Sequence, residues 1–445
     1  GSGYMNIAIS LCNELARRGY DITALGMGYN GAEHHWDFSI IPVASHEAFG
    51  VIPVMIHNLR SLAQAGEAEE IEAIVVALDI PMHERLLQID RGSIPYVGIF
   101  PVESGPLCAS WAQVISTFDE RLVISQFGLR QMEKAGVPGI HFPVGIDTDS
   151  WRPAATGERP MLRESLGISE DEFVILTVAD NQERKNLSVG AEIIRDLVNE
   201  GLNVKWNLVT RKMSPVGWKL DDLFMEYGIM ENVIVYERGM PHDRLWILHV
   251  TSDLFMLTSK AEGLCMPVLE AMATKTPVIA THSTAMPEHL WEDPLWDREQ
   301  NGKWEPLPEK GWLEKLRAFL LNTAKLDAVT RRRGLPIEVE FYTRDPWGNS
   351  YRAFASAEDG VRKVKQIMNM PDHLLEVILQ NGLTYAVSRN WESAGAVVDN
   401  VLKKILTKDK LVLPNQSLVD NINPNTIPSP VPVQVSPQGV EDDQA

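Results

Sequence analysis

Two carboxylates, Glu262 and Glu270, are separated by seven residues in a segment whose pattern suits the binding of a phosphorylated ligand. The segment lies between two apolar runs, residues 253–257 and 277–280, so it is predicted to form the loop and helix of a strand–helix–strand unit. Open α/β sheets bind ligands beyond the carboxyl ends of their strands, and the free N–H groups of a helix start favour an anion. Because hydroxyls donate to carboxylates and phosphate oxygens accept from N–H groups, the pattern suits a polyhydroxylated ligand joined to a phosphate.

The same residues allow a simpler interpretation. Pro267 favours a helix that begins near Met266, which would place Glu270 in the first helical turn. Glu270 could then only complement the helix dipole, and Glu262 could be an ordinary solvated loop residue. For a short motif considered by its spacing alone, this second interpretation is the more common one.

Two cations follow another predicted strand. Arg184 and Lys185 lie in the exit loop of the apolar run 173–179, just before a predicted helix at 187–199. Arginine offers a planar fork and lysine a point charge, so the pair suits a diphosphate. A solvated surface pair is the alternative.

The first part of the chain contributes two weaker candidates. Glu103 lies in a Pro- and Gly-punctuated loop after the predicted strand 95–100, where it could face a ligand or be a surface residue. Gly3 precedes a helical pattern and could form part of a phosphate cradle, although a plain turn explains two glycines equally simply.

Bulk composition narrows the class of protein. The net charge of −19 opposes binding to nucleic acid and to anionic lipid surfaces. No apolar run reaches the ~18 residues that span a bilayer, so no transmembrane segment is predicted. The chain has three cysteines without paired spacing, which argues against a disulfide framework or a zinc site and fits a reducing cytoplasm. No Asp-x-Asp metal cluster stands out, so metal dependence is not predicted.

The stretch EGLCMPVLEAMATKTPVIA resembles the signature of the family 4 retaining glycosyltransferases, and the phrases LARRGYDIT and HFPVGIDTDSWRP resemble others in the expected order. By resemblance, Glu262 contacts the donor sugar and Glu270 the nucleotide ribose. The loop amides that would bind the diphosphate belong to Gly263, Leu264, Cys265 and Met266, with Cys265 in place of a frequent glycine.

The family also has Gly-Arg at a strand end and a Lys about five residues later, both on the donor diphosphate. Lys185 matches that Lys, whereas Asp180 stands at the Arg position and Arg184 could compensate. Glu103 lies near the place of a catalytic His or Asp. The resemblance therefore implies Glu262, Glu103 and Lys185 as catalytic residues, and Gly3, Arg184, Lys185, the 263–266 loop and Glu270 as donor-binding residues.

The implied fold is α/β, with two doubly wound Rossmann-like domains facing across a cleft, the arrangement called GT-B. The first strand of the N-terminal domain is expected to be missing. The predicted divisions are an acceptor domain at 1–153, a linker at 154–160, a nucleotide-sugar domain at 161–345, C-terminal helices at 346–412 that cross back to the first domain, and a disordered Pro-rich tail at 413–445. Within the fourth part, one helix is predicted at 350–368 and another at 372–408.

The implied function is transfer of a sugar from a nucleotide diphosphate sugar to an acceptor hydroxyl, which could belong to a saccharide, a lipid-linked molecule or a protein. The nucleotide sugar is the donor substrate, and no permanently bound cofactor is implied. Two alternatives remain: a non-catalytic partner subunit that binds sugar nucleotides, suggested by Asp180 and the altered glycines, and another GT-B enzyme such as a sugar-nucleotide epimerase.

Overall fold

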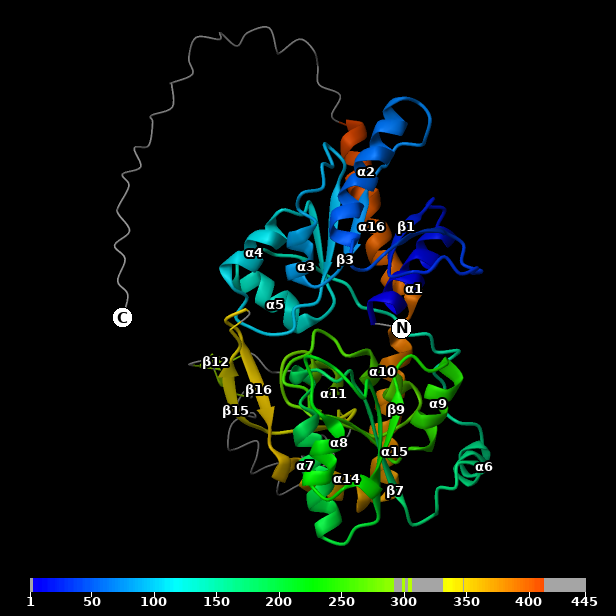
Figure 1. The fold of residues 1–445 in the computed structure, drawn as a ribbon, viewed down its shortest axis with the longest axis vertical. Helices are drawn as coiled ribbons and strands as arrows, with labels where there is room; N and C mark the ends of the chain where they lie inside the picture. The colour runs from blue at the N-terminus through cyan, green and yellow to red at the C-terminus, as the bar shows by residue number, and fades with distance from the viewer. Residues whose placement is uncertain (1–2, 292–297, 301–302, 306–330, 347, 412–445) are drawn as a thin grey trace, which may run out of the picture.

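The computed structural model describes residues 3–291, 298–300, 303–305, 331–346 and 348–411 (Figure 1). The tail predicted at 413–445 lies outside the described residues. The two ends of the described chain belong to one half of the molecule, because α16 (Trp391–Leu411) packs against α1 (Gly3–Arg17). The chain therefore leaves the N-terminal domain, builds the C-terminal domain and returns.

The N-terminal domain contains two parallel sheets. A four-stranded sheet has the order β3-β4-β5-β6, and a separate pair is formed by β1 and β2. The strands are β1 (Thr23–Met27), β2 (Ser39–Val43), β3 (Ile74–Ala77), β4 (Tyr96–Phe100), β5 (Glu120–Val123) and β6 (Ile140–His141). The helices that follow α1 are α2 (Ala48–Gln64), α3 (Ile80–Arg85), α4 (Ala109–Ser116) and α5 (Gln126–Lys134). Every residue of β4 is buried, as expected for a central strand covered on both faces.

The C-terminal domain is built on a six-stranded parallel sheet with the order β14-β11-β10-β7-β8-β9. The strands are β7 (Phe173–Val178), β8 (Val204–Thr210), β9 (Val233–Glu237), β10 (Leu254–Leu257), β11 (Val278–Thr281) and β14 (Leu335–Ile337). The helical elements are α6 (Glu158–Ser165), η1 (Glu183–Lys185), α7 (Leu187–Asn199), α8 (Leu220–Glu226), η2 (Met230–Asn232), α9 (His242–Thr251), α10 (Met266–Ala273), α11 (Met286–Leu290) and α14 (Ala357–Met368). The first of these, α6, begins inside the stretch predicted as a linker.

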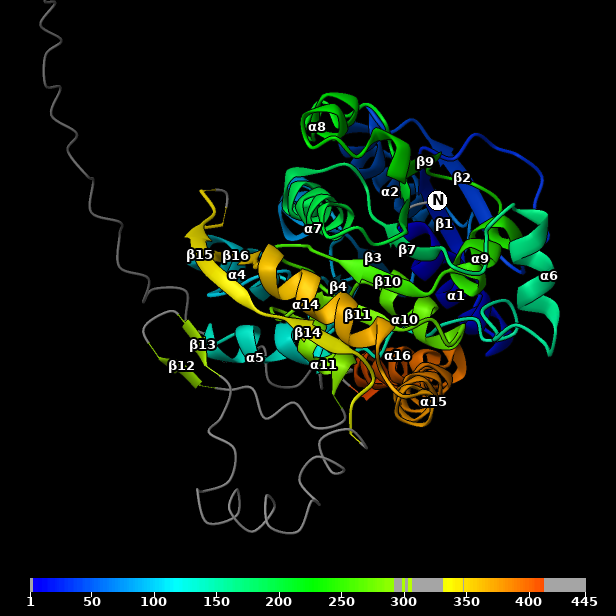
Figure 2. The same ribbon diagram turned by 90° about the horizontal axis from the view of Figure 1, so that it is seen from below.

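Helices cover both faces of this sheet, as the view from below shows (Figure 2). Apolar residues of α7, α8 and α14 form one buried cluster with the sheet, and those of α9, α10 and α11 join a second cluster. Such a doubly wound sheet leaves the carboxyl ends of its strands and the loops after them as the place for a ligand.

The C-terminal segments differ from the prediction. Residues 350–368 do not form one helix: β16 (Tyr351–Ala355) comes first, and α14 follows and packs on α7 and β14 of the C-terminal domain. The predicted helix at 372–408 is two helices, α15 (Asp372–Ser388) on α10 and α16 on α1. The element that returns to the N-terminal domain is therefore α16, and Tyr20 donates to Asp399 of α16 at 2.9 Å across that contact.

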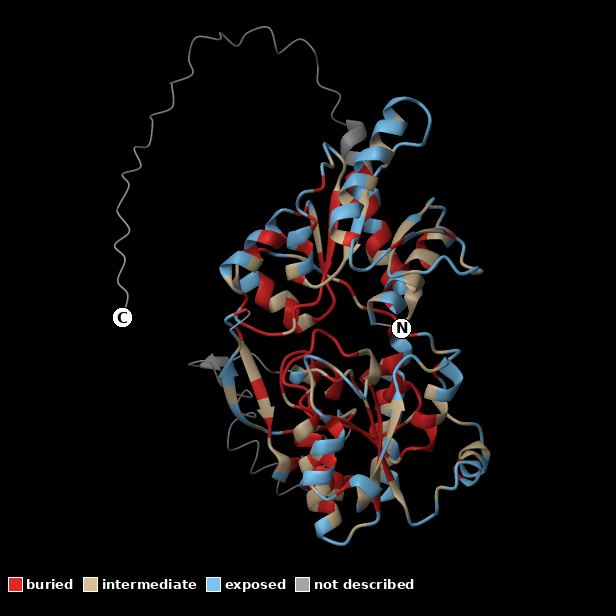
Figure 3. Cartoon of the chain, in the orientation of Figure 1, coloured by how far each residue is buried: buried red, intermediate tan, exposed pale blue. Residues whose placement is uncertain are grey.

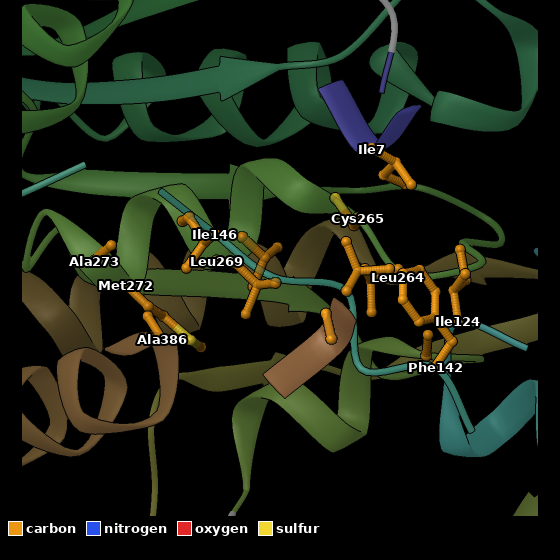
Figure 4. Close-up of a cluster of buried hydrophobic side chains, with 14 of the residues drawn as sticks. Ile7, Ile124, Phe142, Ile146, Leu264, Cys265, Leu269, Met272, Ala273 and Ala386 are labelled. Atoms are coloured by element: carbon orange, nitrogen blue, oxygen red, sulfur yellow. The ribbon is translucent and has the colours of Figure 1, made fainter. Parts of the chain in front are cut away.

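The two domains share an apolar core beneath the segment that carries the two carboxylates. Buried residues in Figure 3 run through both sheets and continue where the domains meet. In Figure 4, Leu264 lies beside Ile124 and Phe142 of the N-terminal domain, and Leu269 lies beside Ile146. This shared core fixes the start of α10 against the first domain.

Two antiparallel hairpins complete the described chain. One consists of β12 (Arg298–Gln300) and β13 (Lys303–Glu305), and the other of β15 (Val339–Arg344) and β16. The second hairpin extends from the C-terminal domain towards α4 and α5, on the left in Figure 1. None of the described helices is long and apolar enough to cross a bilayer.

Candidate functional site

Four charged side chains from both domains meet near the carboxyl ends of β4, β7 and β10. Lys185 Nζ lies 2.6 Å from Glu262 Oε1, and Arg184 Nη1 lies 3.4 Å from Glu262 Oε2. The other edge of the same guanidinium reaches the N-terminal domain, where Arg184 Nη2 lies 3.1 Å from Glu103 Oε1. The structure thus brings together the three residues predicted as catalytic, Glu262, Glu103 and Lys185, with Arg184 between them.

Local backbone bonds hold the two cations in place. Arg184 and Lys185 form the single turn η1, which ends at Asn186 in a left-handed conformation with φ 54° before α7 begins. Lys260 N donates to Arg184 O at 2.8 Å, so the turn is tied to the segment that leads to Glu262. Glu262 N in turn donates to Thr284 Oγ1 at 3.0 Å. These bonds connect the loops after β7, β10 and β11 into one unit.

The electrostatics of this cluster keep Glu262 ionised. Burial favours the neutral acid, but Lys185 and Arg184 outweigh it and lower the pKa of Glu262 from 4.5 to about 2. Burial raises the pKa of Glu103, while Arg184 opposes the shift and Asp79 adds to it. Burial lowers the pKa of Arg184, but Glu103 and Glu262 overcome this effect and raise it. Arg184 is therefore a permanent cation shared by two carboxylates of different acidity.

The loop between the two carboxylates is tightly packed. A Cβ on Gly263 would lie 2.9 Å from Pro101 Cβ, so this glycine permits the close approach of the N-terminal domain. Leu264 O accepts a hydrogen bond from His289 Nε2 at 2.6 Å. Cys265 caps α10 with φ 71°, a conformation that favours glycine. The predicted start of the helix near Met266 is confirmed.

Glu270 lies apart from the charged cluster. It is the fifth residue of α10, so its predicted place in the first helical turn is wrong by about one residue. Its side chain is buried, and burial raises the pKa of Glu270 to about 8. His249 Nε2 lies 4.0 Å from Glu270 Oε2, and burial lowers the pKa of His249 to about 3, so this neighbour is neutral. Glu270 is consequently a neutral acid at pH 7.

Gly3 is the first residue of α1, and a Cβ placed on it would meet no atom within 4 Å. The next residue, Tyr4, donates a short hydrogen bond to Asp79 Oδ1 at the end of β3. Burial raises the pKa of Tyr4, as do Asp79 and Glu103, whereas Arg184 lowers it. The start of α1 therefore lies close enough to the charged cluster to share its field.

Three further cations were missed by sequence reasoning. Arg211 and Arg238 follow β8 and β9 directly, and both bind Asp180, the residue after Ala179 at the end of β7. Arg211 Nε lies 2.8 Å from Asp180 Oδ1, and Arg238 Nη1 lies 3.0 Å from Oδ2. Their position after parallel strands was the signal that could have identified them. The third, Arg352 of β16, lies 3.7 Å from Glu103 and carried no signal of this kind.

A known protein family matches the part of the chain that supplies Arg184, Lys185 and Glu262. Residues 158–327 match the family model of glycosyl transferases, group 1. Residues 158–327 thus form a glycosyl transferases group 1 domain, and Arg184, Lys185, Glu262 and Glu270 all lie within the match.

Among curated relatives, D-inositol 3-phosphate glycosyltransferase 1 of Catenulispora acidiphila is 30% identical over 143 residues, 31% of this chain and 33% of that protein. The GDP-mannose-dependent alpha-(1-6)-phosphatidylinositol monomannoside mannosyltransferase of Mycolicibacterium smegmatis is 27% identical over 181 residues, 39% of this chain and 46% of that protein. The matched part spans about half the length, or less, of the curated relatives.

Similarity to solved structures extends over nearly the whole chain. Sucrose-phosphate synthase from Thermosynechococcus elongatus superimposes with a TM-score of 0.66 at 12% identity, covering 92% of this chain and 94% of that one. The glycosyltransferase WaaG, involved in lipopolysaccharide biosynthesis, gives a TM-score of 0.57 at 15% identity and covers 90% and 96%. Both are GT-B proteins, and the fold of this chain is GT-B.

Proposed function

We propose that this protein is a retaining glycosyltransferase of family 4, which transfers a sugar from a nucleotide diphosphate sugar to an acceptor hydroxyl. The observation that carries the proposal is the convergence of Arg184, Lys185, Glu262 and Glu103 at the boundary of the two domains. Three of these residues lie in the group 1 domain, and the fourth comes from the facing domain. A donor held by one domain would thereby meet an acceptor held by the other.

In this proposal each charged group has its own part of the donor. Arg184 and Lys185 bind the diphosphate together with the amides of Gly263 to Met266, because the loop ends at the start of α10. Glu262 accepts hydrogen bonds from the sugar hydroxyls, since its low pKa keeps it an acceptor. Glu270, as a neutral carboxyl group, exchanges hydrogen bonds with the ribose hydroxyls.

The chemistry required is the departure of the diphosphate. The acceptor oxygen forms a bond to the anomeric carbon on the face from which the diphosphate leaves, while the bond from that carbon to the phosphate oxygen breaks. The proton of the acceptor hydroxyl passes to the departing phosphate oxygen, so the configuration is retained without a covalent glycosyl-enzyme. Arg184 and Lys185 stabilise the negative charge that develops on the leaving group, and Glu103 faces the transferred sugar.

A second proposal accounts for Asp180. Arg211 and Arg238 supply one positive charge more than Asp180 neutralises, at the strand edge where the family has its arginine. We propose that these two residues replace that arginine in attracting the donor. From its unpaired cysteine pattern, we also propose that the protein works in a reducing cytoplasm.

The test is to incubate the purified protein with UDP-, GDP- and ADP-sugars and a panel of saccharide, lipid-linked and peptide acceptors, and to follow products by mass spectrometry. A glycosylated acceptor whose new linkage keeps the anomeric configuration of the donor is the expected result. Tight binding of a nucleotide sugar without transfer or hydrolysis would indicate a non-catalytic binding subunit. An altered free nucleotide sugar would indicate an epimerase.

A further inference from the structure

The β15–β16 hairpin occupies an unusual place in the chain. It is inserted between β14, the edge strand of the C-terminal sheet, and α14, which returns to cover that sheet. The hairpin does not join the six-stranded sheet, and it reaches from the C-terminal domain to the N-terminal domain (Figure 1). The hairpin therefore adds no strand to the C-terminal sheet, and its contacts with the N-terminal domain are its distinguishing feature.

Its residues bind the N-terminal loop that carries Glu103. Tyr351 N donates to Gly105 O at 2.8 Å, and the buried hydroxyls of Ser350 and Ser104 lie 2.6 Å apart. The tip of the hairpin packs on α4, because a Cβ on Gly348 would lie only 2.7 Å from the ring of Trp111. The hairpin therefore holds Ser104 and Gly105, the two residues that directly follow Glu103.

The same strand binds the C-terminal domain two residues later. Ala353 N donates to Lys260 O at 3.0 Å, and Lys260 Nζ lies 3.9 Å from the centre of the Phe354 ring. Lys260 is two residues before Glu262. One short strand therefore connects the loop of Glu103 directly to the loop of Glu262.

Arg352 lies between these two attachments. Its side chain is 13% exposed, and its Nη1 atom points to Glu103 Oε2 at 3.7 Å. Its Nε and Nη2 atoms lie 2.8 and 2.6 Å from Asp345 Oδ2, which fixes the guanidinium in orientation. Nη1 makes no hydrogen bond within the described part of the chain, so this edge of the guanidinium is directed at Glu103 alone.

We propose that the β15–β16 hairpin is a clasp between the two domains, and that Arg352 is a positioning residue for Glu103. Arg184 is shared between Glu103 and Glu262, and the proposed diphosphate would draw on it as well. Arg352 forms ion pairs with Glu103 and Asp345, so it is the cation that stays with Glu103 when the donor engages Arg184. The effects expected on kcat rest on the proposed function. The effects expected on the structure rest only on the contacts of the hairpin.

A double-mutant cycle tests the positioning role. Arg352→Gln is expected to lower kcat about tenfold. It should leave donor binding unchanged, as measured by the rise in melting temperature that the donor produces. In the Glu103→Gln background the same change is expected to lower kcat by less than about twofold, because Arg352 acts through Glu103. Arg352→Lys should restore part of the lost rate. Arg344→Gln, on the same hairpin but with its guanidinium bound to Asn349 O and the Tyr351 hydroxyl, should leave kcat unchanged. Equal losses in both backgrounds would overturn the positioning role.

Hydrogen exchange tests the clasp without any need for turnover. Ser350→Ala is expected to speed amide exchange in residues 101–107 relative to the wild type and to Arg344→Gln, since it removes the hydroxyl by which the hairpin holds Ser104. Unchanged exchange in that loop would overturn the clasp. A wild-type protein that turns over no donor while this exchange effect is present would contradict the proposed function and leave the clasp standing.

Discussion

The two carboxylates of one short motif have opposite electrostatic environments. Glu262 lies against Lys185 and Arg184 and has a pKa of about 2, whereas Glu270, on the next helix, has a pKa of about 8. Both side chains are buried, so burial does not explain the difference. The cause is that η1 brings two cations to Glu262 and none to Glu270, which faces a neutral histidine. The spacing of the motif thus determines where the two carboxylates lie, whereas η1, about 80 residues earlier in the chain, determines that Glu262 is ionised.

Glu262 and Glu270, at the two ends of the motif, have different physical roles. Glu262 acts as a charge: it holds two cations in one geometry and accepts hydrogen bonds only. Glu270 acts as a neutral hydrogen-bonding group, which glutamine can imitate. Variants at the two positions should therefore differ in activity, in stability and in the pH dependence of stability.

The largest effect is expected from removing the cations at the Glu262 end. The double variant Arg184→Ala with Lys185→Ala should lower kcat/KM by at least about 10³, because the leaving diphosphate loses its stabilising charges. Steady-state kinetics measures this, with the donor that the panel of UDP-, GDP- and ADP-sugars identifies. The control is Arg195→Ala with Lys365→Ala, which removes two half-buried cations of α7 and α14 that lie outside the charged cluster, and it should have normal kinetics. Similar kinetics in both double variants would contradict the assignment of the phosphate site.

Stability should separate the two carboxylates next. Glu262→Gln leaves half-buried Lys185 without its charge partner and leaves Arg184 with Glu103 alone, so it should cost about 3 kcal/mol in the free energy of unfolding at pH 7. Glu270→Gln should cost nothing at pH 7 and should instead raise the free energy of unfolding, because the unfolded wild type gains free energy by ionising Glu270 whereas the amide has no charge to gain. Denaturant unfolding measures both values. Equal losses would show that Glu270 is ionised in the folded protein.

The pH dependence of stability should have opposite signs at the two positions. The folded pKa of Glu270 is raised from 4.5 to about 8, so its contribution is fully present below pH 4.5 and is lost as the pH rises towards 8. The folded pKa of Glu262 is lowered from 4.5 to about 2, so its contribution is present above pH 4.5 and is lost as the pH falls towards 2. The free energy of unfolding of the wild type minus that of Glu270→Gln should therefore fall by up to about 1.4 kcal/mol per pH unit between pH 4.5 and about pH 8. A flat difference would contradict the raised pKa.

The smallest effect concerns the backbone between the two carboxylates. Cys265 has φ 71°, which costs about 1 kcal/mol for a residue with a Cβ. Cys265→Gly should therefore be more stable than Cys265→Ala by about 1 kcal/mol, because both lose the buried sulfur and only glycine relieves the conformation. Thermal unfolding of the pair measures the difference. Equal stability would mean that the loop relaxes around either residue.

Much of the fold follows from local patterns in the sequence. The alternation of apolar runs with amphipathic segments predicts the parallel sheets, and Pro267 predicts the start of α10. The β15–β16 hairpin was missed because the short alternation in Tyr351–Ala355 runs into a helix without a glycine or proline between them. Ser356, which accepts from Asp359 N as the helix cap, was the available signal for the boundary.

The candidate site was predictable in part for a physical reason. Arg184, Lys185 and Glu262 follow neighbouring parallel strands, and the carboxyl ends of such strands meet at one edge. The contact of Glu103 with Arg184 depends on how two domains pack, and the contact with Arg352 depends on a hairpin about 250 residues away. The charge state of Glu270 depends on which side chains surround it in the folded core, and the sequence around it contains no trace of that environment.

The most direct test of the central contrast is the turnover of Glu262→Gln and Glu270→Gln, measured side by side with a saturating donor and acceptor. Glu262→Gln should lower kcat by about 10² or more, because it removes the charge that orients Arg184 and Lys185 at the leaving diphosphate. Glu270→Gln should stay within about threefold of the wild type, because the amide preserves the hydrogen bonds of a neutral acid. Equal losses in the two variants, or a larger loss at Glu270, would contradict the account.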